Sequence, residues 1–218
     1  MPKQKIGIYI VLVGMAIYTI YLNMYDQRFI GVLFHEDGIL ESAEAILYLL
    51  ASIGFLYLCK KQGFKNIWIW GLAVLFFLIA GEEISWGQRI FSIATPESIA
   101  DINVQQELNV HNINGIHQHV RLFGVIVILT ICYLIPASDR FIGSVRRFYK
   151  KIKMPVFPLW AVGIPTIAIL FMVIPRVFYG VKDFNMDEAG ELYLAIGFFI
   201  FLLDQLKQSR PATPIKPS

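Results

Sequence analysis

Two adjacent glutamates follow a strongly apolar run in the segment GEEISWGQRI, residues 81–90. Glu82 and Glu83 are joined further along the chain by His111, in a stretch rich in asparagine and glutamine. Carboxylates and a histidine can hold zinc, manganese or iron, and a catalytic metal of this kind lowers the pKa of its bound water. Without a metal, the same groups can act as general acid and base on a water molecule. The residues therefore predict catalysis by one of these two routes, with Glu82, Glu83 and His111 as the metal ligands in the first.

A second group of carboxylates occurs in the segment HEDGILESAEAILYLL. Asp37, Glu41, Glu44 and Tyr48 are spaced i, i+4, i+7 and i+11, so they share one face of a helix. Carboxylates at membrane depth cost several kcal/mol unless they are neutralised, paired or hydrated. We therefore expect this face to turn toward protein or water, and we predict that Asp37 and Glu41 complete the catalytic site. In the alternative, the carboxylates are neutral or hydrogen-bonded within a helix bundle and have no catalytic role.

Four further polar residues of the same region predict a site for a substrate. Arg89 can hold an anionic head group such as phosphate, because its guanidinium forms paired hydrogen bonds with such groups. Gln88, Asn109 and Asn112 can bind a polar head group or a sugar through their amides. The same amides can instead satisfy the backbone of an irregular segment, since unpaired polar groups are not tolerated at membrane depth.

These residues must be positioned by membrane-spanning helices. The chain has 218 residues, of which 56% are hydrophobic and 16% charged, and its mean hydropathy of +0.60 lies outside the range of soluble domains. About 20 apolar residues are needed to cross a bilayer. The sequence predicts an all-α, polytopic membrane bundle of about six transmembrane helices, over residues 6–25, 39–59, 67–84, 122–135, 157–179 and 191–206. The fourth and sixth of these spans are short.

The distribution of charge predicts the orientation of the bundle. With the N-terminus inside, 14 of the 19 lysines and arginines lie on the cytoplasmic side, whereas 14 of the 16 carboxylates lie on the outer side. Because positive residues stay in the cytoplasm, we predict that both termini are cytoplasmic, that the protein is a multi-pass protein of the bacterial plasma (inner) membrane, and that the polar site is extracytoplasmic. The basic segment 139–153 fits a loop beside anionic lipid, not a nucleic-acid site.

The longest outer loop, residues 86–119, contains a helix signal of its own. The letters TPES predict a short interfacial or re-entrant helix with Thr95 as N-cap and Pro96 at the first helical position. The rest of the chain shows no domain boundary, so residues 1–206 are predicted to form a single transmembrane domain. Residues 207–218, with the sequence KQSRPATPIKPS, predict a disordered cytoplasmic tail.

The blocks FHEDGILE, GEEISWGQRIF, TPE and NVQQELNVHN resemble those of a group of bacterial integral membrane proteins. The group shares an EEISWGQR core followed by an NxQxExNxHN stretch, and the resemblance runs from about the second span to His111. No activity is assigned to the group, so the resemblance implies kinship without a function. His35, His117 and His119 fall outside it, which favours a glutamate-rich site with His111 over a site of three histidines.

Three functions are compatible with these patterns. The first is a hydrolase or transferase that acts on a lipid or lipid-linked substrate and uses a divalent metal, zinc or manganese. The second is a proton- or cation-coupled transporter or channel that uses Asp37, Glu41 and Glu44 as a relay. The third is a non-catalytic assembly or scaffold subunit. The expected partners are membrane lipid and a second copy of the chain or another membrane protein, and no nucleic acid is expected.

Overall fold

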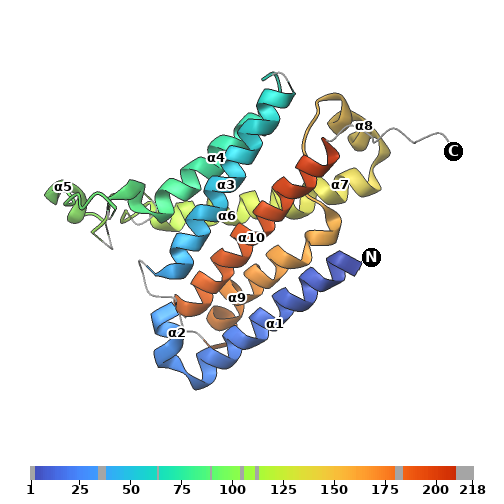
Figure 1. Cartoon of the computed structure of the whole chain (residues 1–218). Helices are drawn as coiled ribbons and strands as arrows, with labels where there is room; N and C mark the ends of the chain where they lie inside the picture. Colours follow the sequence, from blue (N-terminus) through green and yellow to red (C-terminus); the bar gives the residue numbers. More distant parts are fainter. Residues whose placement is uncertain are drawn as a thin grey trace.

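A computed structural model describes residues 3–33, 38–62, 64–88, 90–103, 106–110, 113–179 and 184–209, and for residues 27, 30, 31, 117, 118, 120, 121, 176–179, 184 and 185 it describes the backbone alone. Within this part of the chain the secondary structure is helical, and strand pairing is limited to a single antiparallel bridge between Asn103 and Ile113. In chain order (Figure 1) the helices are α1 (Lys3–Tyr25), α2 (Gln27–Leu33), α3 (Ile39–Lys61), α4 (Ile67–Glu83), the 3-10 turn η1 (Ser85–Gly87), α5 (Glu97–Ala100), α6 (His117–Leu129), the π turn η2 (Thr130–Leu134), α7 (Ile135–Phe141), α8 (Gly143–Lys151), the 3-10 turn η3 (Leu159–Ala161), α9 (Gly163–Tyr179) and α10 (Phe184–Gln208).

The predicted all-α class is confirmed, and each predicted span overlaps a helix, although the helix of the fifth span begins only at Gly163. Among the described residues, four helical segments are long and apolar enough to cross a membrane: Lys3–Tyr25, Ile39–Lys61, Leu122–Phe141 and Met186–Gln208. Helices α4 and α9 have 17 residues each, which gives about 26 Å of rise against about 30 Å of hydrocarbon. Four candidate spans are therefore established, and the count of six stays a prediction.

Two spans that looked short in the sequence belong to longer helices. Helix α10 has 25 residues and extends through Gln208, because the acidic residues that interrupt its hydropathy, Asp187 and Glu188, lie within the helix. The fourth span continues through η2 into α7. Pro136, near the start of α7, has no N–H to donate to the preceding turn, and the helix widens into the π turn η2 just before it.

The short helix predicted in the outer loop is present as α5, but its start differs. Pro96 occupies the N-cap position and Glu97 is the first helical residue. Thr95 does not cap the helix, because its hydroxyl donates to the carbonyl of Gln106 at 2.6 Å. The location of α5 at a membrane interface stays a prediction.

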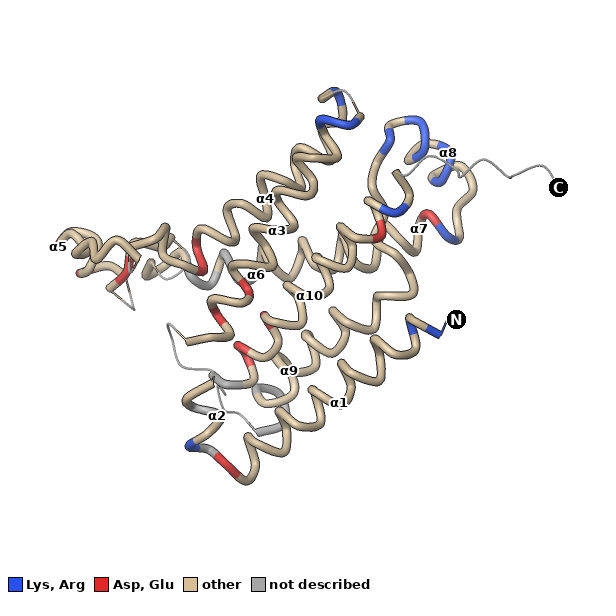
Figure 2. Tube along the Cα trace, in the orientation of Figure 1, with Lys and Arg blue, Asp and Glu red and all other residues tan. Residues whose placement is uncertain are grey.

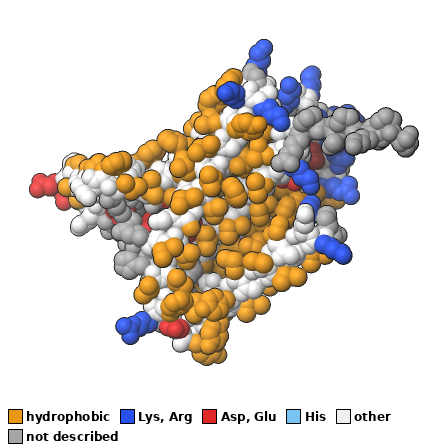
Figure 3. Space-filling model, viewed as in Figure 1, with side chains coloured by type: hydrophobic (Ala, Val, Ile, Leu, Met, Phe, Trp, Pro, Cys, Tyr) orange, Lys and Arg blue, Asp and Glu red, His pale blue; other side chains and the backbone are white. Residues whose placement is uncertain are grey.

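Helices α3, α4, α9 and α10 pack together, while α1 lies along one side (Figure 1). In the apolar window of α10, 56% of residues are buried, compared with 11% in the span that contains α6 and α7. Large apolar side chains such as Ile10, Ile17 and Phe77 are exposed, and apolar atoms cover the middle of the visible surface (Figure 3). An apolar exterior of this extent is the surface that lipid, not water, would cover.

Helix α10 packs closely against α9 at Gly190. A Cβ atom on Gly190 would lie 2.9 Å from the backbone carbonyl oxygen of Ala168 on α9, so the two backbones can be this close only because the side chain is absent. Tyr193 donates from its hydroxyl to the carbonyl of Leu12 on α1 at 2.7 Å. These contacts fix the part of α10 that carries Glu191.

Six rings fill the middle of the bundle, and we call them the aromatic layer: Tyr48, Phe55, Phe76, Phe157, Phe198 and Phe201. None of them is more than 4% exposed. Phe76 lies at the centre, with ring centroids 5.0 Å from Phe198, 5.7 Å from Phe55 and 6.1 Å from Tyr48. Tyr48 follows Glu44 by one helical turn, so the aromatic layer begins directly below that carboxylate.

The two ends of the bundle differ in charge (Figure 2). Lysines and arginines gather at the turn between α3 and α4, at α8 and at the N-terminus. Carboxylates gather at the opposite end, where α3 and α10 begin and α4 finishes. The charge separation read from the sequence is therefore also a separation in space.

Candidate functional site

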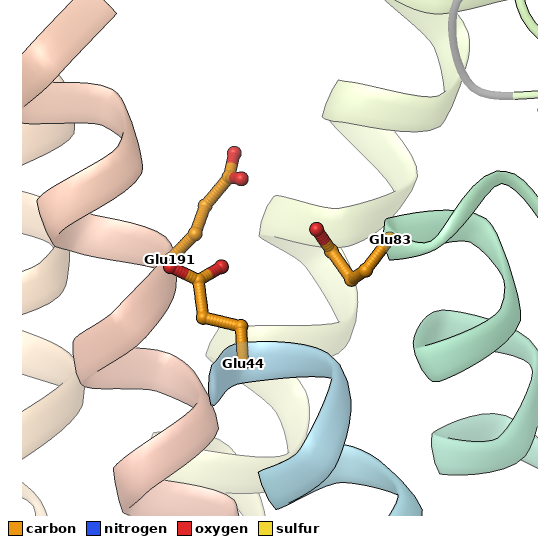
Figure 4. A group of neighbouring side chains, drawn as sticks. All are labelled: Glu44, Glu83 and Glu191. Carbon is orange, nitrogen blue, oxygen red and sulfur yellow. The ribbon is translucent and has the colours of Figure 1, made fainter. Parts of the chain in front are cut away.

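Three glutamates from three helices meet at the acidic end of the bundle (Figure 4). Glu44 lies in the second turn of α3, Glu83 is the last residue of α4, and Glu191 lies about two turns into α10. One carboxylate oxygen from each can be chosen so that all three lie within 4.8 Å of one another. We call this group the glutamate cluster.

The glutamate cluster follows from the direction of the helices. Helices α3 and α10 both begin at this end, and α4 ends here after running back along α3. Glu83 occupies the C-terminus of α4, where the helix dipole is negative and disfavours another negative charge. Its position is therefore unfavourable unless positive charge or a proton compensates it.

Glu44 is the most constrained member of the glutamate cluster. Its side chain is 0% exposed, and within the described residues neither of its carboxylate oxygens has a hydrogen-bond donor. Coulombic repulsion from Glu83 and Glu191 acts on it, and Glu41 and Glu188 add to this repulsion. Burying an ionised carboxylate is costly unless it is paired or coordinated. A bound cation, a shared proton or a basic group from outside the described residues would offset this cost.

A hard divalent cation fits this set of donors. Carboxylate oxygens are the ligands that calcium, magnesium and manganese prefer. Two oxygens on opposite sides of one ion are separated by twice the metal–oxygen distance. This separation is about 5 Å for calcium and about 4 Å for magnesium. The largest separation in the glutamate cluster, 4.8 Å, suits calcium directly and suits the smaller ions after a contraction of less than about 1 Å. Manganese, one of the two metals predicted from the sequence, matches the oxygen donors better than zinc does.

Glu82 points to a different set of partners from its neighbour Glu83. Its carboxylate accepts a hydrogen bond from Trp86 Nε1 at 2.6 Å and another from the backbone N–H of Val110 at 2.7 Å. The ring of Trp86 lies against Gly81, where a Cβ atom would be 2.8 Å from it. Glu82 thus ties the end of α4 to the outer loop.

Ser85 belongs to a buried polar network in the same loop. Its hydroxyl donates to Glu107 Oε2 at 2.6 Å, and Asn109 Nδ2 donates to the same oxygen at 2.9 Å. Ser85 and Trp86 have φ angles of 45° and 55°, in the left-handed region that costs free energy for residues other than glycine. The network provides the contacts that hold this turn.

The two amides that the structure describes among the predicted substrate ligands are used within the protein. Asn109 is buried and bonds inside the network. Gln88 accepts from the N–H of Leu108 at 2.7 Å through its side-chain oxygen and donates to the hydroxyl of Thr95. These contacts correspond to the structural alternative, in which amides satisfy an irregular segment. Their role in substrate binding stays a prediction.

The remaining predicted residues divide into two groups. Glu41 is partly exposed and precedes Glu44 by one turn on α3. Four candidates lie outside the described residues: Asp37, Arg89, His111 and Asn112. The predicted ligand set of Glu82, Glu83 and His111 therefore shares Glu83 with the glutamate cluster and otherwise stays a prediction.

Sequence reasoning did not join Glu44 and Glu191 to the metal ligands. The sequence predicts Glu44 as part of a transport relay, and it predicts Glu191 only as the first residue of the sixth span. The sequence does contain one signal that these glutamates belong together. Each lies near the end of a predicted span, and all three ends are on the predicted outer side. What the sequence lacks is the packing order that makes α3, α4 and α10 neighbours.

Together these features define a protein whose described residues form a helical bundle, with four helices long and apolar enough to span a membrane and a carboxylate cluster near one end. Comparison with protein families, with curated proteins and with solved structures finds no match to this chain.

Replacing Glu82 by alanine is expected to loosen the outer loop without removing a cluster ligand. The variant loses two hydrogen bonds to a charged acceptor, so amide exchange in residues 106–110 should rise by about tenfold or more. Hydrogen–deuterium exchange with mass spectrometry measures this. Glu97→Ala, at an exposed glutamate of α5, is the matched control and should leave the exchange unchanged. Equal protection in Glu82→Ala and the unmodified protein would show that Glu82 does not hold the loop.

Proposed function

We propose that the protein is a divalent-metal-dependent hydrolase or transferase of the membrane that acts on a lipid or lipid-linked phosphate. The observation that carries the proposal is the buried carboxylate of Glu44, which has no hydrogen-bond donor among the described residues and faces two further glutamates. A hard cation resolves this arrangement, and such cations bind through a few carboxylates together with substrate phosphates.

Glu44, Glu83 and Glu191 would hold the metal. A divalent cation held there would supply Lewis-acid chemistry, which polarises a phosphoryl oxygen and lowers the pKa of water. Glu83 and Glu191 are partly exposed, whereas Glu44 is not, so a head group would reach the glutamate cluster from the acidic end. In hydrolysis, the oxygen of water forms a bond to phosphorus, the bond from phosphorus to the leaving oxygen breaks, and the leaving oxygen takes up a proton.

The aromatic layer favours a site that opens at one end of the bundle. It disfavours the alternative function, transport through the bundle. A transporter needs polar groups along its whole path. Below Glu44 the bundle continues with Tyr48, Phe76 and Phe55, which are almost completely buried and packed ring to ring. Apart from the hydroxyl of Tyr48, the side chains of this layer are apolar, so it offers an ion no series of polar groups to follow.

The orientation completes the proposal. The basic end of the bundle faces the cytoplasm by the positive-inside rule, which makes both termini cytoplasmic and the glutamate cluster extracytoplasmic. Six helices then cross the bacterial inner membrane, with α4 and α9 as the shorter spans. Membrane lipid is the partner of the exposed apolar faces.

Metal analysis together with an activity assay tests the proposal. The protein is purified without chelator, its metals are counted by mass spectrometry, and phospholipids with phosphomonoester, phosphodiester and diphosphate head groups are offered. We expect one equivalent of calcium, magnesium or manganese and metal-dependent release of phosphate or of a phosphorylated head group from at least one lipid. Glu83→Gln should lose this turnover.

Two results would overturn the proposal in different ways. A protein without metal after equilibration with all three ions would mean that protons or a basic side chain from outside the described residues compensate the glutamate cluster instead. Bound metal without turnover on any of the lipid classes would leave a metal-stabilised assembly subunit, the scaffold function predicted as an alternative.

A further inference from the structure

A pocket lies at the basic end of the bundle, far from the glutamate cluster in the fold. Its volume is about 230 Å³, and it is lined by Gln62, Lys65, Asn66, Lys151, Ile152 and Lys153. These residues come from the turn between α3 and α4, from the last residue of α8 and from the segment that follows it. We call it the lysine pocket.

Asn66 builds the lysine pocket by joining its two sides. Its side-chain oxygen caps α4 by accepting from the N–H groups of Trp68 and Ile69, and its Nδ2 donates to the carbonyl of Lys153 at 2.7 Å. Asn66 is only 6% exposed. Lys153 has a φ of 52°, which turns the chain back at this point. The positions of the lysines are therefore set by a buried contact between segments that lie 87 residues apart.

Among the described residues, no acidic group compensates the charge of the lysine pocket. Lys65, Lys151 and Lys153 line it, and none of its lining residues is acidic. Within the described residues, no ion pair or hydrogen bond engages the three ammonium groups. Three positive charges around one small volume repel one another, and an anion with two or more negative charges would relieve that repulsion.

The surroundings of the lysine pocket identify the anion as part of a lipid. Ile67 and Trp68, which follow Asn66 directly, are exposed. Ile67, Trp70, Val74 and Phe77 continue as an exposed apolar stripe along α4, with spacing that keeps them on one helix face. Acyl chains can lie along this stripe while their head group occupies the lysine pocket. Basic pockets between helices on the cytoplasmic side have this relation to anionic lipids.

We propose that the lysine pocket binds the phosphate head group of an anionic phospholipid, with acyl chains along the exposed face of α4. A phospholipid with two phosphate groups suits it best, because its two negative charges offset most of the charge of the three lysines and its two phosphates can reach both sides of the pocket. The proposal shares no residue with the glutamate cluster and does not depend on the enzymatic function.

Lipid binding can be measured by native mass spectrometry of the full-length protein in a non-ionic detergent. Diphosphatidylglycerol is the probe, and phosphatidylcholine is the zwitterionic comparison. The test variant carries Lys65→Gln, Lys151→Gln and Lys153→Gln. The control variant carries Lys60→Gln, Lys150→Gln and Lys207→Gln, which remove the same charge from exposed lysines outside the pocket.

The unmodified protein and the control should both prefer the anionic lipid. The test variant should bind diphosphatidylglycerol about a hundredfold more weakly, since each lysine near an anionic head group contributes severalfold to affinity. Because all six lysines are exposed, both variants are expected to unfold at the same temperature as the unmodified protein.

Three outcomes would overturn the proposal. Equal loss of binding in the test and control variants would show a general effect of positive charge. An unmodified protein that binds phosphatidylcholine as well as diphosphatidylglycerol would show no head-group site. Displacement of the lipid by an equal concentration of inorganic phosphate would make the pocket a site for free anions.

Discussion

Glu44→Gln is expected to abolish binding of the divalent metal and to stabilise the metal-free protein. The change removes one of three negative charges and leaves a neutral side chain of nearly the same shape at a fully buried position. Without metal, repulsion within the glutamate cluster falls, so the variant should unfold at a higher temperature than the unmodified protein in chelator. With metal at a hundred times its dissociation constant, the unmodified protein should gain about 2.7 kcal/mol and the variant almost nothing.

Thermal unfolding followed by tryptophan fluorescence, with and without metal, measures both effects in one experiment. Glu97→Gln is the matched control, because Glu97 is an exposed glutamate of α5 outside the glutamate cluster. It should respond to metal as the unmodified protein does. If the unmodified protein ignores the metal and Glu44→Gln lowers its stability in chelator, a proton or a basic side chain from outside the described residues holds the cluster together.

The second large effect concerns the aromatic layer. Phe76→Ala is expected to lower the free energy of unfolding by about 3–5 kcal/mol, the usual cost of removing a buried phenylalanine ring. Phe76 is 0% exposed and contacts three other rings of the layer. The cavity left by its ring would lie between α3, α4 and α10, so these helices would lose contact just below the glutamate cluster.

Phe77 provides a control one residue away. Its side chain is 51% exposed, and its ring contacts Trp86 edge to face at 6.1 Å between centroids. Detergent or lipid can fill the space that Phe77→Ala leaves, so we expect a loss of about 1 kcal/mol or less. Reversible unfolding in mixed micelles compares the two variants. Equal losses would show that the aromatic layer is not a packed core.

Hydropathy and charge were sufficient to predict the helices because lipid imposes simple constraints on length and composition. They failed at helix ends, where Asp187 and Glu188 lower the hydropathy of a segment that is still helical. In the sequence, these acidic residues indicate the end of an apolar span. In the structure, they lie within α10, which continues past them. The length of α10 therefore depends on packing.

The candidate site was predictable only in part. Helical spacing placed Glu44 on a face that turns inward, and the apolar run placed Glu83 at a membrane interface. Their meeting with Glu191 depends on the close approach of α9 and α10 at Gly190 and on α10 lying against α3. The role of amides such as Asn109 could not be predicted from the sequence, because an amide side chain can form hydrogen bonds with a ligand or with the protein backbone equally well.

The order in which the helices are synthesised determines when the glutamate cluster can form. Glu44 and Glu83 belong to an early helix pair, but Glu191 arrives with α10, which is synthesised well after both. Domains form from the N-terminus as synthesis proceeds, so the nascent bundle holds two facing carboxylates and lacks the third until α10 inserts. Under the proposed function, the metal could be captured only after this step, and a chain truncated before α10 would carry the cost of the buried charges without a complete set of ligands.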